Sequence, residues 1–383
     1  MKIAIACIVK NEFDYILEWL AYHRSVIGIQ NFIIADNVST DGTTQLLEAL
    51  DSLKVIKRIH FPRVEAEKGI QVDAYNYILS EYGSKYDYIC FIDADEFIVN
   101  NSSVPFETFL KKSKPDALAL NWRIFGSSGQ YYQTNKLVID RFTLASRHDH
   151  KYNHHIKSVL NPASVNTMYV HHASLKKGRN YLDCTKNKML FIEDLKDFKV
   201  LEHAITPFSK VIHNNDLYVA HFVVKSKSEH MDKKASRGSA AGSALRQKGI
   251  GYFKGHDLNQ VECLDLKKHN KTVLKEFCNL DERLVKETTF YSHVRYHIDR
   301  FDQTISGWVS LKNKQNIVIK ILAGEVKEFE FAPSVKRKDV YDIGLSEVEL
   351  CGFSIDISAY KKEQLKIWIK GSNVVLWDGA RGY

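Results

Sequence analysis

Two aspartates and a glutamate directly follow an apolar segment in the first third of the chain. Residues 88–92 are almost wholly apolar, and Asp93-Ala94-Asp95-Glu96 comes next. A continuous apolar run of this length is typical of a strand buried on both faces of a parallel sheet. Such sheets bind ligands beyond the carboxyl ends of their strands. We therefore predict that Asp93 and Asp95 hold a divalent cation, Mn²⁺ or Mg²⁺, which would bridge the phosphate oxygens of a nucleotide.

A cation at that position could stabilise a diphosphate leaving group. When a sugar leaves a nucleoside diphosphate, negative charge develops on the departing oxygen, and a divalent cation neutralises it. The alternative interpretation of Asp93 and Asp95 is a polar turn after a strand, because two aspartates at this spacing are common by chance.

The preceding residues alternate between strand and helix patterns, which predicts βαβ units and a parallel sheet. We expect strands at 3–9, 31–35, 55–60 and 86–92, and helices at 14–25, 45–50 and 70–81. Beyond the acidic triplet we expect a helix at 106–112, strands at 117–122, 137–142, 156–160, 168–172 and 217–222, and a basic helix running into a loop over 225–253.

The last ninety residues differ in pattern. Short β-type segments at 317–322, 327–331, 351–357 and 365–369 are separated by polar turns, which favours an all-β sandwich. The predicted fold class is α/β, with a Rossmann-like domain over residues 1–240, a basic, helical linker region over 241–290, and a smaller β-sandwich domain over 291–383.

Charge and hydropathy limit the partners. The net charge is +8, yet residues 1–100 carry 9 Lys and Arg against 15 Asp and Glu, so the basic character lies later in the chain. No apolar run is long enough for a membrane span or a signal peptide, so we expect a cytoplasmic protein. The basic middle is either a solvated face or a peripheral contact with the inner membrane face. It lacks the arginine and aromatic pattern of nucleic-acid binding, so no nucleic-acid partner is expected.

Several motifs in order resemble glycosyltransferases of the GT-A fold. They are residues 5–12, Glu18-Trp19 with His23, residues 34–43 and residues 93–97. With residues 125–129 and 221–226 they are similar to the family 2-like and family 92 branch of bacterial surface-polysaccharide type, over about residues 1–240. The resemblance implies an inverting hexosyltransferase that takes a hexose, galactose by preference, from a UDP-sugar. The acceptor would be an oligosaccharide or a lipid-linked saccharide, in surface polysaccharide or lipopolysaccharide synthesis.

The resemblance also implies residue roles. Nucleotide contacts would come from Val9, Asn11, Glu12, Asp36, Lys68, Gln71, Asp93 and Lys225. Asp95 would be the principal metal ligand and His221 a further one, with His171 and His172 as competitors. Lys233 and Arg237 would join Lys225 near the diphosphate. For Asp36 the alternative role is a local capping carboxylate, and for the lysines a solvated helix face.

The catalytic base is the least defined residue. Related enzymes place a Glu-Asp pair after a glycine-containing acceptor loop, but the loop at 125–129 is followed by Asp140 alone. We expect Asp140 to take the acceptor proton, with Glu96 as the second candidate, and a surface ion pair as the alternative role of Asp140.

Two other classes of function remain open. A nucleotidyltransferase would need a glycine-rich phosphate loop after the first strand, where this chain has Val9-Lys10-Asn11-Glu12. A non-catalytic carbohydrate-binding protein would not need the paired carboxylates at Asp93 and Asp95.

Overall fold

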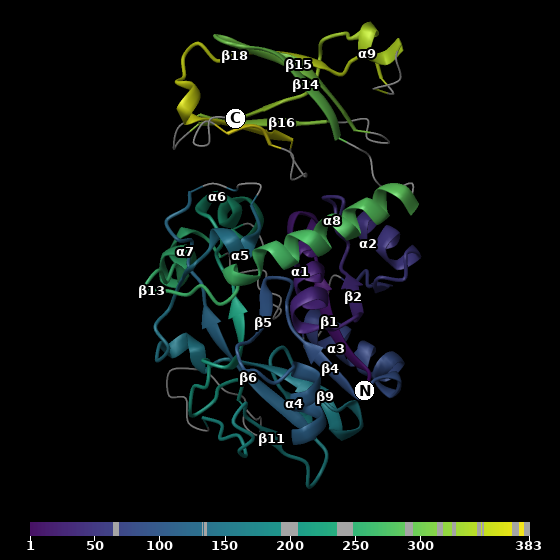
Figure 1. Ribbon diagram of the computed structural model, residues 1–383, viewed down its shortest axis with the longest axis vertical. Coiled ribbons are helices and arrows are strands. Elements are labelled where there is room, and N and C mark those ends of the chain that lie inside the picture. The colour runs from purple at the N-terminus through teal and green to yellow at the C-terminus, as the bar shows by residue number, and fades with distance from the viewer. Residues whose placement is uncertain are drawn as a thin grey trace. The chain divides into compact units, whose positions relative to one another are not determined.

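The protein divides into two compact units, Met1–Asp281 and Glu282–Tyr383. The computed structural model describes residues 1–63, 69–131, 133, 136–192, 206–235, 248–287, 294–311, 317–323, 327–342, 346, 348–369 and 375–378 (Figure 1). The segment expected to be a linker contains elements of the first unit. In that segment α7 (Ile250–His256) precedes β13 (Val261–Glu262), which pairs with β7 (Leu144–Ala145), and α8 (Asn270–Glu287) follows.

The first unit is built on a mixed sheet with the strand order β3-β2-β1-β4-β8-β6-β12-β5. Its strands are β3 (Lys57–His60), β2 (Asn31–Asp36), β1 (Ile3–Val9), β4 (Tyr88–Phe91), β8 (Ile156–Leu160), β6 (Ala117–Ile124), β12 (Leu217–His221) and β5 (Glu96–Asn100), with β11 (Tyr181–Leu182) beside β6. The first four are mutually parallel, β8 is antiparallel to both neighbours, and β5 is antiparallel to β12. The predicted α/β class is confirmed.

Helices cover both faces of the parallel half of this sheet. Tyr75 and Ile78 of α3 (Ile70–Tyr82) pack with Ile33 and Ala35 of β2 in one core cluster. Trp19 of α1 (Phe13–Tyr22) meets Phe32, which points to the other face, with ring centroids 5.7 Å apart. Because successive strand residues alternate between faces, the nearly continuous apolar strands bury side chains on both sides.

The remaining helical segments of the first unit are short. They are η1 (His23–Ile27), α2 (Thr43–Ser52), η2 (Gly83–Lys85), α4 (Phe106–Ser113), α5 (Val138–Arg141), η3 (Lys151–His154), η4 (Pro162–Ser164), α6 (Lys227–Glu229), η5 (His230–Lys234) and η6 (Lys267–His269). Two of these, η1 and η5, are π-helical. No helix in the described ranges is long and apolar enough to cross a membrane.

The strand predicted at 137–142 is wrong, because this segment forms the helical turn α5. The carboxylate of Glu18, in α1, accepts the backbone N–H groups of Val138 at 2.8 Å and Ile139 at 3.1 Å. These are donors that a first helical turn leaves unpaired. A carboxylate 120 residues away therefore selects the helix.

The strand predicted at 168–172 is also wrong. Strand β9 (Val165–Met168) ends where the prediction begins, and β10 (Ala173–Leu175) pairs back on it, so the intervening residues form the reversal. Its closure is the hydrogen bond from Tyr169 N to His172 O at 2.8 Å. Strand β5 was not predicted, since its first residue belongs to the acidic motif.

The described residues of the second unit form two antiparallel sheets. One has the order β14 (Val294–Phe301), β15 (Thr304–Leu311), β18 (Gly352–Asp356); the other has β17 (Lys327–Phe331), β16 (Ile319–Ala323), β19 (Leu365–Ile369), β20 (Val375–Asp378). The short helices α9 (Lys338–Asp342) and η7 (Lys362–Gln364) lie between strands. Ile305 and Phe353 of the first sheet share a core with Ile321 and Ile367 of the second, as in the predicted sandwich.

Candidate functional site

The acidic motif lies at the carboxyl end of the central parallel strands. Strand β4 ends at Phe91, beside β1, and the turn that follows presents Asp93 and Asp95. Strand β12 delivers His221 to the same place, because His221 is in register with Glu96 of β5 and Phe222 N donates to Asp95 O at 2.9 Å. The structure therefore brings five of the predicted residues together: Asp93, Asp95, Glu96, His221 and Gln71, whose Nε2 donates to Asp93 Oδ1.

Asp95 and His221 face each other. Asp95 Oδ1 lies 3.6 Å from His221 Nε2, and the two side chains are 15% and 9% exposed. The Trp122 ring packs on the imidazole at 4.3 Å and restricts its orientation. Burial lowers the pKa of His221, against the opposing effect of Asp95, so the imidazole is neutral at neutral pH and can act as a ligand.

The Asp95 carboxylate is ionised. Burial alone would raise its pKa, but the Lys234 ammonium group outweighs burial and holds the pKa of Asp95 well below its usual range. Lys234 Nζ donates to Asp95 Oδ2 and, at 2.6 Å, to the carbonyl oxygen of Val223. Asp95 thus carries a full negative charge in a largely buried position.

Asp93 is held by three donors. Its Oδ1 accepts from Gln71 Nε2 at 2.7 Å and from the Tyr75 hydroxyl at 3.1 Å, and its Oδ2 accepts from Lys157 Nζ at 2.8 Å. The Asp93 side chain is 30% exposed, whereas Lys157 is fully buried. Because its oxygens already meet these donors, Asp93 is better placed to orient a ligand than to be a main metal ligand.

Glu96 is fully buried beneath the motif. Its Oε2 accepts the Asp93 N–H at 2.8 Å and lies 3.4 Å from Lys157 Nζ. Its Oε1 lies 3.9 Å from His221 Nδ1, and neither of these two atoms has a hydrogen-bond partner. Burial raises the pKa of Glu96 to about 8, despite Lys157. In this conformation Glu96 gives an acceptor hydroxyl no access, so its geometry does not suit a catalytic base.

Asp140 is outside this group. It lies on α5, where its Oδ1 pairs with Lys267 Nζ at 3.3 Å, and Lys267 is 47% exposed. This is the surface ion pair that the sequence left open as the alternative. A role for Asp140 as base remains a prediction without geometric support.

The predicted cations meet different partners. Lys225 is buried with positive φ and lies over the Tyr15 ring at 4.1 Å; burial lowers its pKa, and Lys234 adds to the effect. Lys233 pairs with Asp14 at 2.5 Å, and Arg237 lies outside the described residues.

Sequence reasoning missed Lys157 and Lys234. The signal for Lys157 was its position inside a predicted strand, whereas Lys234 had no distinguishing local signal.

The predicted nucleoside contacts lie on two loops that brace each other. Asn11 Oδ1 accepts Thr40 N–H at 2.7 Å, and Glu12 N–H donates to Thr43 Oγ1 at 2.9 Å. The loop from Val9 also joins Asn37, whose N–H donates to Val9 O at 2.9 Å.

Asp36 is 1% exposed and accepts from Thr44 Oγ1 at 2.6 Å and Arg58 at 3.3 Å. Asp36 therefore has local hydrogen-bond partners, and its contact with the nucleoside stays a prediction. Lys68 lies outside the described residues.

The predicted acceptor loop at 125–129 is locked to the segment after α7. Ser127 N–H donates to Asp257 Oδ1 at 2.6 Å, and Ser128 N–H donates to Asn259 Oδ1 at 2.7 Å. A Cβ on Gly126 would lie 2.3 Å from Asn259 Oδ1, so this position requires glycine. No local sequence pattern marks Asp257 or Asn259.

The competing histidines lie farther from the carboxylates. His171 packs edge-on against Trp122 at 5.1 Å, and burial holds its pKa well below the usual range. His172 stacks on Tyr169 at 5.0 Å. Of the three histidines, only His221 has an ion-pair distance to Asp95.

The donor set suits a divalent cation bound jointly with a ligand. Within the described ranges no three metal-ligating side chains form a cluster. One cation could nevertheless bind both Asp95 Oδ1 and His221 Nε2, because these atoms are 3.6 Å apart. The other ring nitrogen of His221, Nδ1, has no hydrogen-bond partner and lies 3.9 Å from Glu96 Oε1. Mn²⁺ and Mg²⁺ are commonly held by one or two protein side chains together with substrate phosphates and water. The residues therefore fit such an ion.

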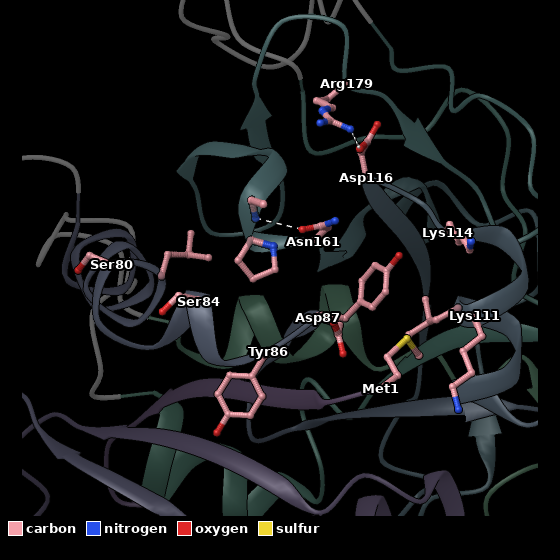
Figure 2. Close-up of a pocket in the computed structure, with 16 residues that line it drawn as sticks. Met1, Ser80, Ser84, Tyr86, Asp87, Lys111, Lys114, Asp116, Asn161 and Arg179 are labelled. Carbon is pink, nitrogen blue, oxygen red and sulfur yellow. Dashed lines mark hydrogen bonds and ion pairs between the residues drawn. The ribbon is translucent and has the colours of Figure 1, made fainter.

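A cavity of 830 Å³ lies at the opposite edge of the sheet. Figure 2 shows Met1, which precedes β1, with Tyr86 and Asp87, which precede β4, in one part of the cavity lining, and Asp116 and Arg179 in another. Arg179 and Asp116 form an ion pair at 3.0 Å. The amino ends of the parallel strands border this cavity, and none of the predicted site residues lines it.

Comparison with known proteins identifies relatives of the first unit. The family model described as glycosyltransferase family 92 matches residues 4–237. A family 92 protein of Oryza sativa subsp. japonica is 25% identical over 195 residues, which is 49% of this chain and 32% of the relative. A family 92 protein of Ricinus communis is 25% identical over 198 residues, covering 48% and 34%. The chain thus spans about a third of the length of these curated relatives.

Among solved structures, S. aureus TarS 1-349 in complex with UDP has 18% sequence identity, a TM-score of 0.29, and coverage of 43% of this chain and 47% of that one.

Proposed function

Since the chain belongs to glycosyltransferase family 92, we propose that it is a metal-dependent glycosyltransferase that moves a hexose from a UDP-sugar to a saccharide acceptor. The observation that carries this proposal is the pairing of Asp95 Oδ1 with His221 Nε2 at 3.6 Å, at the carboxyl end of the parallel strands. An ionised carboxylate and a neutral imidazole in one largely buried position are suited to a divalent cation.

In this proposal the residues around Asp95 bind and orient the donor. A divalent ion bound there would neutralise the charge that develops on the departing diphosphate. Asp93, fixed by Gln71 and Lys157, would orient the ribose or the metal-bound phosphates. Trp122 packs on His221 and restricts its orientation.

The finer specificity is also a proposal. The motifs of family 92 type favour galactose as the sugar and inversion at the anomeric carbon, with a growing surface saccharide or lipopolysaccharide as acceptor. The basic residues between 225 and 275, 12 Lys and Arg against 5 Asp and Glu, support work beside an anionic membrane surface on the cytoplasmic side.

A donor screen tests this function. The unfolding temperature of the full chain would be measured with UDP-galactose, UDP-glucose and UDP-N-acetylglucosamine, each with and without Mn²⁺. A ligand at 100 times its Kd stabilises the folded state by about 2.7 kcal/mol, which is several degrees for a domain of this size. We expect one UDP-sugar to give that rise only with Mn²⁺, and to be converted to UDP when an acceptor is present.

Matched carboxylate variants complete the design. Asp95→Asn should abolish the metal-dependent rise, because it removes the charged ligand. Asp116→Asn, at the opposite edge of the sheet and paired with Arg179, should leave it unchanged. If no UDP-sugar stabilises the protein in the presence of Mn²⁺, or if both variants behave alike, the proposed function is wrong.

A further inference from the structure

The ammonium group of Lys234 already occupies the carboxylate that would bind the metal. Lys234 Nζ donates to Asp95 Oδ2, while Asp95 Oδ1 faces His221. The Lys234 side chain is 18% exposed, so it is largely withdrawn from solvent but still reaches the surface of the site. One carboxylate thus meets a cation on one oxygen and the proposed second metal ligand on the other.

The position of Lys234 is fixed by the segment that carries it. Lys234 is the last residue of η5, which directly follows the short helix α6. Glu229 in α6 closes a capping box with Ser226 and forms a fully buried ion pair with Arg141. Because buried charged groups anchor this segment, the fold itself positions Lys234 against Asp95. The contact is not that of a mobile surface lysine with a nearby carboxylate.

Neighbouring lysines cannot serve in the same way. Lys157 is fully buried between Asp93 and Glu96, and Lys225 is 4% exposed above the Tyr15 ring. Of these three lysines, Lys234 alone contacts Asp95 and has a partly exposed side chain. Its four-carbon chain can move the charge over several ångströms while the backbone stays in place.

Resting on the function proposed above, we propose that Lys234 exchanges partners when the donor binds. It neutralises Asp95 in the free enzyme, and it transfers to the diphosphate when Asp95 binds a divalent cation. The reason is electrostatic: an ammonium and a divalent cation on one carboxylate repel each other, whereas the diphosphate brings new anionic oxygens within reach of Lys234. Lys234 would then compete with the metal and assist the nucleotide.

This dual role predicts effects of opposite sign from one substitution. In Lys234→Met, Asp95 loses its internal cation, so we expect the Kd of Mn²⁺ alone to fall by about tenfold. The Kd of UDP for the Mn²⁺-saturated protein should rise by about tenfold, because a charge-assisted contact to the diphosphate is lost. Both constants would be measured by isothermal titration calorimetry on the full chain. Lys234→Arg keeps the charge and should retain the UDP affinity to within a few-fold.

Lys111→Met is the matched control. Lys111 Nζ pairs with Glu107 at 2.7 Å on α4 and lines the cavity at the opposite edge of the sheet, so neither constant should change. Thermal melts would verify that each variant is folded.

Three outcomes would overturn the proposal. If Lys234→Met weakens Mn²⁺ and UDP binding alike, Lys234 has only a structural role. If neither dissociation constant changes, the contact between Lys234 and Asp95 affects neither metal binding nor nucleotide binding. If the wild-type protein binds UDP without Mn²⁺ and Lys234→Met abolishes that binding, the ammonium replaces the metal. By contrast, a wild-type protein that binds neither UDP nor Mn²⁺ would refute the proposed function itself, and this proposal with it.

Discussion

Replacing Lys157 with methionine tests whether one buried lysine holds the acidic motif in place. Lys157 Nζ lies 2.8 Å from Asp93 Oδ2 and 3.4 Å from Glu96 Oε2, and its side chain has no solvent exposure. Methionine fills a similar volume but cannot donate. Asp93 would keep its bonds from Gln71 and Tyr75, whereas Glu96 would lose the cation beside it.

The expected loss of stability follows from these partners. Removing one member of a buried ion pair costs about 3–5 kcal/mol. The lower end applies, because Asp93 is 30% exposed and has two other donors, and because Glu96, whose pKa burial raises to about 8, is already largely protonated at pH 7. We therefore expect Lys157→Met to destabilise the first unit by about 3 kcal/mol. At 2–4 °C per kcal/mol for a unit of this size, its Tm should fall by roughly 6–12 °C.

Differential scanning calorimetry at pH 7 would measure this change on the full chain. Because the chain has two compact units, the transition of the first unit must be followed separately. Lys111→Met removes a lysine whose pair with Glu107 is about half exposed, and should shift the Tm by no more than about 1–2 °C. If Lys157→Met melts within 2 °C of this control, the reasoning about the buried pair is wrong.

Three further predictions concern charges and packing around the site. Burial raises the pKa of Glu18 from 4.5 to about 7 in the folded protein, so the folded state keeps a proton that the unfolded state releases, and the contribution of Glu18 to stability falls as the pH rises from about 4.5 to 7. The stability of Glu18→Gln relative to wild type should therefore rise by roughly 3 kcal/mol between pH 5 and pH 8. If urea titrations give the same stability difference at both pH values, this reasoning is contradicted. Burial would raise the pKa of Glu229, but Arg141 holds it at about 2, so the stability from this ion pair is present above about pH 4.5 and is lost as the pH falls towards 2. Arg141→Met should therefore flatten the acid limb of the plot of stability against pH. A plot parallel to that of the wild type would show that the ion pair does not contribute this stability. Gly126→Ala places a methyl group 2.3 Å from Asn259 Oδ1 and 2.9 Å from the backbone of Leu258, which should lower the free energy of unfolding by about 1–3 kcal/mol. The same change should raise the KM for the acceptor more than the KM for the donor. Equal changes in both KM values would show that the loop does not bind the acceptor.

The site around Asp95 is assembled from segments that lie far apart in the sequence. Strand β12 reaches the site from residue 217 onward, whereas β1 and β4 come from the first hundred residues. The site therefore depends on pairing between distant segments, and loss of any one of Lys157, Lys234 or Arg141 should affect it.

Local pattern determined the elements and the acidic motif. The apolar runs of β1, β2 and β4 and the spacing of α3 are properties of neighbouring residues, and they were predicted to within a few positions. The placement of Asp93 and Asp95 follows from them, because parallel strands end at one edge of a sheet. His221 could be expected at that edge for the same reason, as the end of a predicted strand.

Tertiary structure alone decided which charges meet. Residues 138–141 form a helical turn because Glu18, 120 residues away, accepts the N–H groups of Val138 and Ile139, and a local sequence pattern cannot include so distant a carboxylate. Asp95 meets Lys234 across 139 residues, and Asp93 meets Lys157 across 64. Such contacts depend on how distant segments pack, since a buried charge is stable only where the fold supplies its counter-ion. The sequence by itself therefore determined where the acids lie, and the packing of the chain decided which partners control them.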